Sequence, residues 1–392
     1  MSEARAPSPP IRSETPARPA SEWLPTAPGV THVAPHVRDA LDVRRALGCV
    51  LLAVLPCALV GVVNAGHQAL LVAGDRGPTA PSGWRGDLLG VLGLAPEPES
   101  TAACAVYGLA CALPMLAVAL GVSRAWQQLF ARVRGRVPSE AVPVVAVLFT
   151  LVLPPGIPLW QVALGITFAT VVGLEIFGGT GRNVVNPALA GLAFLYFAYP
   201  ASFSSEGAWV ALEGPGTPTV LAAAAQGGLD AVQALGVTWR GTLLGWEPGA
   251  LGETSALACA LGAAFLVYAR VASWRVIAGG LLGLVVSAAL ARALGDAERP
   301  LVSFPWHWHL TAGSFAFGLA FLATDPVTSA ATAVGRWLYG GLIGALVVLV
   351  RVFNPAHAEG VMLAILLANV SAPLIDHLVV RVHVRRRRRR LG

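Results

Sequence analysis

Long apolar runs separated by short polar segments make up most of the chain between residues 46 and 380. Several runs reach the roughly 20 residues that an α-helix needs to cross the hydrocarbon core of a bilayer. Others are shorter, and Pro154-Pro155 separates two of them, because proline ends or kinks a helix. The pattern predicts an all-α polytopic membrane protein with about ten transmembrane helices. The apolar runs are 46–73, 101–122, 141–155, 159–178, 187–201, 251–269, 276–294, 307–323, 335–353 and 360–380.

The composition favours the same class of protein. Of the 392 residues, 55% are hydrophobic and 12% are charged, whereas soluble domains have about 25% charged residues. The five cysteines lie in apolar runs without a Cys-x-x-Cys pair, so we expect small buried side chains and no metal site. Residues 1–30 are rich in Pro, Ala and Ser, and we expect a disordered arm ahead of a membrane domain at 31–380.

Every basic residue is an arginine, and the arginines gather in alternate connections between the apolar runs. Because positively charged loops remain in the cytoplasm, this side is predicted to be cytoplasmic and to hold both termini of an inner-membrane protein. The connection at about 202–250 has Arg240 as its single arginine and is predicted to face the periplasm. The arginine-rich tail at 381–392 suits anionic membrane lipid, and a nucleic-acid partner is disfavoured beside this many spans. The arginines on the predicted cytoplasmic side are Arg38, Arg44, Arg45, Arg124, Arg132, Arg134, Arg136, Arg182, Arg270, Arg275 and Arg336.

Glu175, Asp325 and Asp376 are carboxylates within or beside apolar runs. A carboxylate inside a membrane is costly and is by default a functional candidate, and a sodium ion prefers oxygen ligands. Glu175 is a candidate of this kind, with a pair to Arg182 as the alternative. For Asp325 the alternative is a cap on the turn before Pro326, and for Asp376 it is a pair with the tail arginines.

The glycine-rich sequence FGGTGRNVVNPALAG, residues 177–191, is a second candidate site. Its glycines permit tight turns and a close approach of the backbone to a ligand. Arg182 suits an anion, and Asn183 and Asn186 suit hydrogen bonds to a ligand ring. The alternative is a cytoplasmic loop that caps the next helix, with Pro187 in the first turn.

A weak internal repeat links the segments that begin at Pro158 and Pro305. Each combines a proline, a tryptophan, a glycine-containing apolar span and then an Asn-Pro or Asp-Pro step. The second segment lies four spans after the first, and an even offset means that both cross the membrane in the same direction. These two helices alone therefore do not form an inverted pair. A repeat of five plus five spans remains open.

Several sequence strings together resemble the NqrB family, a membrane component of the Na⁺-translocating NADH:quinone reductases. The resemblance covers about residues 31–385, and the next most similar family is RnfD, the homologous component of the Rnf ferredoxin:NAD⁺ complexes. The strings are HVRDALDVRRAL at 36–47, PLWQVALGITF at 158–168, FGGTGRNVVNPALAGLAFLYFAYPA at 177–201, YARVASWRVIAG at 268–279, FAFGLAFLATDPV at 315–327 and RVFNPAHAEGVMLAILLANVSAPLIDH at 351–377.

The resemblance implies ten helices in two five-helix repeats, similar to urea and ammonium transporters. It implies a translocase of six subunits, in which electrons pass from NADH through flavins to ubiquinone while Na⁺ is pumped outward. The NqrB component carries a covalent FMN, hosts riboflavin and contributes to the quinone site. Riboflavin is then expected near the loop of Arg182, Asn183 and Asn186.

The family's flavin motif, Asp-Gly-x-Ser-Gly-Ala-Thr, falls without gaps on residues 213–219, in a register fixed by the shared AQGG sequence that follows. The resemblance therefore implies an FMN on Thr219, joined by a phosphoester bond. Glu213 and Gly214 preserve the acid and the first glycine, but Gly-Thr-Pro replaces Ser-Gly-Ala. Thr217 is the alternative attachment residue.

A glycine pair that the family links to quinone binding corresponds here to Ser123 and Arg124. Arginine fills space that glycine leaves open, so the quinone site is expected to differ. Glu175 and Asp376 resemble the family's transport-linked carboxylates. No catalytic side chain is assigned. Two alternatives remain, an Rnf-type component and a flavin-free transporter or channel on the same scaffold, and the replaced Ser-Gly-Ala favours the latter.

Overall fold

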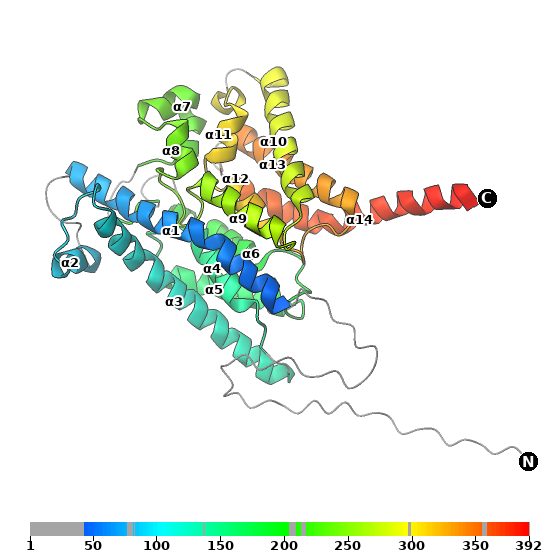
Figure 1. Ribbon diagram of the computed structural model, residues 1–392, viewed down its shortest axis with the longest axis horizontal. Helices are drawn as coiled ribbons and strands as arrows, with labels where there is room; N and C mark the ends of the chain where they lie inside the picture. Colours follow the sequence, from blue (N-terminus) through cyan, green and yellow to red (C-terminus); the bar gives the residue numbers. More distant parts are fainter. Residues whose placement is uncertain are drawn as a thin grey trace, which may run out of the picture. The chain divides into compact units, whose positions relative to one another are not determined.

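Regular secondary structure in the described part of the chain is entirely helical (Figure 1). The expected arm at 1–30 lies outside the described residues, as do Glu213 and Gly214 of the flavin motif. The computed structural model describes residues 43–76, 81, 83–135, 138–203, 209–212, 217–296, 299–354 and 359–391.

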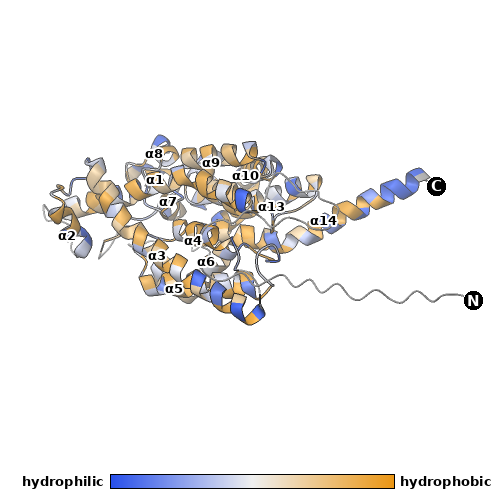
Figure 2. Ribbon diagram, turned by 60° about the horizontal axis from the view of Figure 1, so that its bottom comes forward, coloured by the Kyte–Doolittle hydropathy of each residue, from blue (hydrophilic) through white to orange (hydrophobic). Residues whose placement is uncertain are grey.

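Five helices are long and apolar enough to cross a membrane. They coincide with five of the apolar runs, and the prediction of an all-α polytopic membrane protein is confirmed. The last of them continues through the arginine run to Leu391, beyond the other helices, and its final turns are hydrophilic (Figures 1 and 2). The five are α1 (Val43–Arg76), α3 (Thr101–Arg134), α10 (Trp274–Leu294), α13 (Ala333–Phe353) and α14 (Val361–Leu391).

Rows of exposed aliphatic side chains run along three of these helices. Within each row the residues are three or four positions apart, which places them on one helical face. A continuous apolar face of this length suits contact with lipid tails, where no water competes. The rows are Leu52, Leu55 and Leu59 on α1, Leu282, Val286 and Leu290 on α10, and Leu367, Val370, Leu374 and Leu378 on α14.

The other five apolar runs form shorter or interrupted helices. Two of them end in a π-helical turn, η1 after α5 and η4 after α12, and these are the two segments of the weak repeat. The short elements are α4 (Val142–Leu151), α5 (Leu159–Thr170), η1 (Val171–Glu175), α6 (Pro187–Ala198), α9 (Ala256–Tyr268), α11 (Trp306–Thr311), α12 (Phe315–Phe317) and η4 (Gly318–Leu322).

Two of these short segments meet end to end in the buried core. The backbone N–H of Gly252, just before α9, donates to the carbonyl of Leu151 at the end of α4, with an N–O distance of 2.7 Å. The N–H of Leu251 donates to Leu153 at 3.3 Å. The carbonyls that the end of α4 leaves free are thereby satisfied without water. The end of α4 is therefore joined directly to the segment that precedes α9.

Helices α10 and α13 pack closely because glycines line their contact. A Cβ added to Gly340 would lie 2.2 Å from the carbonyl oxygen of Val276, and one added to Gly344 would lie 2.1 Å from that of Gly280. No side chain fits at such distances, so the two backbones approach each other directly. Small residues at helix contacts serve this purpose in membranes.

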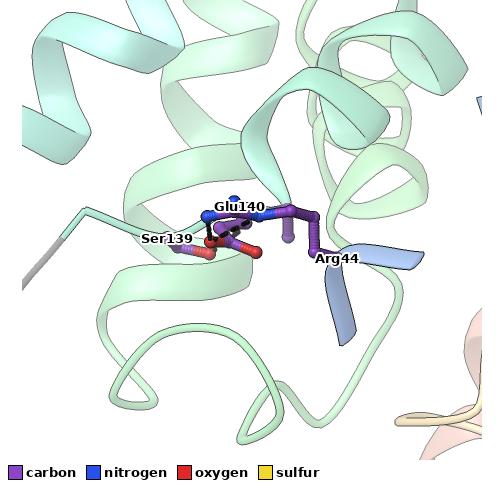
Figure 3. A network of polar contacts seen from close by, with 4 residues as sticks. Arg44, Ser139 and Glu140 are labelled. Carbon is purple, nitrogen blue, oxygen red and sulfur yellow. Dashed lines mark hydrogen bonds and ion pairs between the residues drawn. The ribbon is translucent and has the colours of Figure 1, made fainter. Parts of the chain in front are cut away.

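Polar contacts between connections fall into two groups, one at each end of the helices. In the first group Arg44 pairs with Glu140, next to Ser139 (Figure 3). Ser139 contacts Thr180, and Arg134 pairs with Glu175. All of these lie on the side that the arginines predict to be cytoplasmic.

The second group lies on the predicted periplasmic side. The Tyr107 hydroxyl donates to the carbonyl of Ala211 at 2.8 Å, and Trp239 donates to the carbonyl of His307 at 3.4 Å. Each of these contacts joins segments of the same predicted side. The remaining elements are α2 (Trp84–Val91), η2 (Pro200–Phe203), α7 (Val220–Ala234), α8 (Trp239–Leu244) and η3 (Pro300–Val302).

Candidate functional site

Thr219 is the residue that caps the N-terminus of α7. Its Oγ1 accepts a hydrogen bond from the backbone N–H of Ala222 at 3.2 Å, and the residue is 8% exposed. Such a cap satisfies an N–H that the first turn of a helix leaves free. Thr217 is half-buried and caps no helix in the described chain. Gly228 ends the first part of α7 in a left-handed conformation, with φ of 67°, that favours glycine.

A small cavity lies beside the Thr219 side chain, and we call it the outer cavity. Its volume is about 10 Å³, which is close to the space that one water-sized sphere needs. Three carboxylate residues line it, although two of them lie in the connection between α8 and α9 and the third precedes α14. The lining residues used below are Thr219, Glu247, Glu253, Thr254, Gly313 and Glu359.

The connection between α8 and α9 holds Glu247 and Thr254 with polar atoms unpaired. Asn64 of α1 donates its side-chain N–H to the carbonyl of Glu247 at 2.7 Å, which fixes the backbone there. Both Glu247 and Thr254 are 3% exposed. Within the described chain, Glu247 Oε2 and Thr254 Oγ1 are buried without a hydrogen-bond partner. An unpaired buried oxygen costs about 1–3 kcal/mol, so each is a position that a ligand can relieve.

A fully buried arginine lies behind the third carboxylate. Arg351 of α13 donates from Nη1 to the carbonyl of His309 at 2.6 Å and from Nη2 to that of Ala312 at 3.1 Å. Its Nε donates to the backbone carbonyl of Glu359 at 3.5 Å, whereas the Glu359 carboxylate accepts from the N–H and hydroxyl of Ser314, at 3.3 and 3.1 Å. Among the described residues Arg351 forms no ion pair within 4.0 Å. The Arg351 guanidinium therefore offsets part of the nearby negative charge while it donates hydrogen bonds to backbone carbonyls.

Burial raises the pKa of the Glu247 carboxyl well above its ordinary value, because a charge in an apolar surrounding is poorly solvated. The negative charge of Glu359 raises the pKa further. A hydrogen bond from the Gly313 backbone and the charge of Arg351 act in the opposite direction and are the smaller effects. Glu247 thus prefers a proton or another cation beside it.

Glu175 closes the π turn η1 and pairs with α3. Arg134 Nη1 lies 3.3 Å from Glu175 Oε2 and 2.7 Å from the carbonyl of the same residue. The structure thus joins this carboxylate to Arg134, whereas the sequence offered Arg182 as the alternative partner. An interruption of this type in a helix is frequent at functional sites.

The glycine-rich loop places its two asparagines inside the protein and its arginine outside. Asn186 caps α6 by accepting from the N–H groups of Ala188 and Leu189, and it donates to the carbonyl of Leu322 at 3.3 Å. Asn183 is also buried and donates to Val185 within the loop. Arg182 is exposed. The capping role considered for this loop is therefore present.

Asp376 and Asp325 organise the connection between η4 and α13. Asp376 of α14 accepts from the backbone of Ala331 at 2.7 Å and from the backbone and hydroxyl of Thr332 at 3.0 and 2.5 Å. Asp325 accepts from Val327 at 3.1 Å, as a turn cap would. Burial raises the pKa of Asp325, and the hydrogen bonds from Val327 and Thr328 partly offset this effect.

The two residues expected near the quinone site differ in their exposure on α3. Ser123 is completely buried, and its hydroxyl donates to the carbonyl of Ala119 at 2.5 Å. Arg124, the next residue, is exposed. Of the two, Ser123 faces the interior of the protein and Arg124 is accessible from outside it.

Residues 30–385 match the sequence profile of the NQR2, RnfD, RnfE family. This chain belongs to that family. An NqrB protein of Pseudomonas aeruginosa, named as a component of Na(+)-translocating NADH-quinone reductase, is 47% identical over 365 residues, covering 93% of this chain and 90% of the relative. The protein of that name from Azotobacter vinelandii is 48% identical over 360 residues, covering 91% and 89%. The one from Chromohalobacter salexigens is 48% identical over 363 residues, covering 93% and 88%.

This member of the NQR2, RnfD, RnfE family has buried charges that the sequence patterns above did not single out. Glu253 lies within the apolar run 251–269, and Arg351 lies within 335–353. The rule that selected Glu175, that charges in apolar runs are functional candidates, applies equally to both. Glu247 and Glu359 lie in connections, where acidic residues are ordinary, and only the fold brings them to one cavity.

Proposed function

We propose that this chain is the membrane subunit of a redox-driven Na⁺ pump that passes electrons from NADH to ubiquinone. The observation that carries the proposal is 47% identity over 93% of the chain with NqrB proteins, which are named as components of Na(+)-translocating NADH-quinone reductase. The name implies further subunits, and we expect the hetero-hexameric complex. The Rnf alternative shares the family, but the relatives compared above carry the Nqr-type name.

We infer that Thr219 Oγ1 forms the phosphoester bond to FMN. The oxygen lies at the N-terminus of α7, where backbone N–H groups and the helix dipole favour a phosphate group. The outer cavity is too small for a flavin ring, so the ring belongs outside it. A flavin bound there supplies the electron-carrying chemistry. The chain itself anchors the phosphate at Thr219 and orients it with the N–H groups of α7.

The remaining site residues are proposed from their positions in the fold. Arg182 is the exposed member of the glycine-rich loop and is proposed to contact riboflavin, while Asn183 and Asn186 position that loop. Ser123 and Arg124 mark the proposed quinone region.

For Glu175 and Asp376, a role in the ion pathway competes with the contacts that they already make. A sodium ion at either carboxylate displaces Arg134 or the N–H groups of Ala331 and Thr332. We therefore propose that ion passage there accompanies a movement of α3 or of the connection before α13.

The experiment separates the capping role of Thr219 from its role in flavin attachment. Asparagine caps helices as well as threonine does but offers no hydroxyl, so Thr219→Asn should keep the fold and lose the flavin. Membranes containing the complex are run on a denaturing gel and viewed under ultraviolet light. The wild-type band and the matched control Thr217→Val should fluoresce, and Thr219→Asn should not. A fluorescent Thr219→Asn band, or a dark wild-type band, contradicts the assignment.

A further inference from the structure

We propose that the outer cavity binds one monovalent cation of the size of Na⁺, with the Glu247 carboxylate and the Thr254 hydroxyl as ligands. Glu253 and Glu359 supply further negative charge. The proposal rests on the proposed function, because it names a sodium site on the periplasmic side of that pump, directly beside the flavin threonine.

The first support is the pair of buried oxygens without partners in the described chain. Glu247 Oε2 and Thr254 Oγ1 both belong to residues that line the cavity, and both residues are 3% exposed. Buried polar atoms in native proteins are nearly always paired, and each exception calls for an explanation. Two oxygens of the type that hard cations prefer, lining one cavity, are explained by a cation that they bind.

The second support is the balance of charge around the cavity. Three carboxylates, Glu247, Glu253 and Glu359, influence one another electrostatically, and Arg351 is the cation that acts on Glu247 and Glu359. If all are ionised, three negative charges and one positive charge leave an excess of two negative charges. An uncompensated charge in an apolar region is strongly disfavoured. A bound cation removes one of the two, and a proton on a neighbouring carboxyl removes the other.

The third support is the size and the ligand set, which select the kind of cation. A space of about 10 Å³ admits one ion without its water shell and no larger ligand. Among the described residues no three His, Cys, Asp or Glu side chains come together to hold a metal ion. Divalent cations usually gather several carboxylates or nitrogen and sulfur ligands. A single carboxylate with neutral oxygens suits a monovalent ion.

The position of the cavity connects it to both parts of the proposed pump. Thr219 lines it on one side. On the other side Glu253 follows Gly252, whose N–H binds the end of α4 in the buried core. A cation in the cavity therefore lies between the core junction of α4 and α9 and the flavin attachment residue. An ion that leaves the core toward the periplasm along this connection passes these carboxylates beside Thr219.

The test uses the purified complex and dicyclohexylcarbodiimide, which modifies protonated carboxyls in apolar surroundings. With choline as the only added cation, mass spectrometry should find Glu247 modified. Sodium should suppress this modification several-fold, whereas potassium, a larger ion, should not at the same concentration. Glu253→Gln should raise the sodium concentration for half-protection about tenfold, equivalent to about 1.4 kcal/mol. The exposed control Glu99→Gln should leave it unchanged.

Two results overturn the cation site. One is modification of Glu247 that sodium does not change, which makes the cavity a proton site only. The other is suppression of the modification by potassium as strongly as by sodium, which would mean that the cavity does not select an ion of the size of Na⁺. Flavin fluorescence of the same band tests the proposed function separately. A fluorescent band without sodium protection rejects the cation site alone, and protection in a dark band rejects the flavin assignment alone.

Discussion

Arg134 at the end of α3 donates from one nitrogen to both the carboxylate and the carbonyl of Glu175, at 3.3 and 2.7 Å. The guanidinium thus fixes the π turn that ends α5. Arg134→Gln should lower the thermal stability of the complex in detergent, because the largely buried carboxylate of Glu175 loses the positive charge and the hydrogen bond of Arg134. We expect a cost at the low end of about 1–3 kcal/mol, since the arginine is 31% exposed and solvent screens the pair.

The double variant Arg134→Gln/Glu175→Gln is the control for this pair. Removing the carboxylate charge removes the reason for the loss, so the double variant should recover part of the stability. Equal stability of the single and double variants would mean that packing of the arginine stem, and not its charge, stabilises the turn.

Sequence reasoning located the helices well because the length of an apolar run is a local property. All ten predicted runs contain helix, and the division at Pro154-Pro155 corresponds to the break between α4 and α5. The end of α4 at Leu151 could not be predicted in this way. It depends on the backbone of Gly252, about a hundred residues away, whose N–H replaces the donor that a further helical turn would supply.

Glycines at the contact of α10 and α13 give a second prediction with an internal control. In Gly344→Ala the new Cβ would lie 2.1 Å from the carbonyl of Gly280, so the helices must separate. We expect a loss of about 1–3 kcal/mol, as for other overpacked cores. In Gly341→Ala the nearest atom is 3.8 Å away, at Gly279. That variant should be neutral or more stable by up to about 1 kcal/mol, because alanine favours helix. Thermal unfolding in detergent measures both, and equal effects would refute direct backbone contact.

The cap at Thr219 gives a third prediction, for stability independent of any flavin. Thr219→Val removes the acceptor for the Ala222 N–H and should cost about 0.5–2 kcal/mol. Thr219→Ser retains both the cap and a hydroxyl and should restore stability. Proteolysis of the connection between η2 and α7 offers a local measurement of fraying at this helix end. A fully protease-resistant Thr219→Val chain would show that packing, and not the cap, holds the start of α7.

The candidate site was predicted only in part, for a physical reason. Thr219 was found through a motif within seven residues, and a motif is visible in sequence. The outer cavity combines Glu247 and Glu359, which are more than a hundred residues apart, and neither has an unusual neighbourhood in sequence. What makes Glu247 unusual is its burial, and burial follows from tertiary packing against Asn64 of α1. The side chains that line a cavity cannot be read from local pattern.

Competition between protons and sodium at Glu247 gives the last prediction. Its pKa is raised above the ordinary 4.5, so the carboxyl is protonated over part of the pH range above that value and ionised only at higher pH. Sodium requires the ionised form. The sodium concentration that half-protects Glu247 from the carbodiimide should therefore rise as the pH falls through the raised pKa. The other charged or titratable groups around the cavity are Glu253, Glu359, Arg351 and His309.

Replacing Glu359 tests the direction of this dependence. The negative charge of Glu359 helps to raise the pKa of Glu247. Glu359→Gln should therefore lower that pKa and move the pH dependence of sodium protection to lower pH. Glu99→Gln, an exposed change elsewhere, should leave the dependence in place. A shift to higher pH in Glu359→Gln would mean that Glu359 binds the ion itself and that its charge is part of the site.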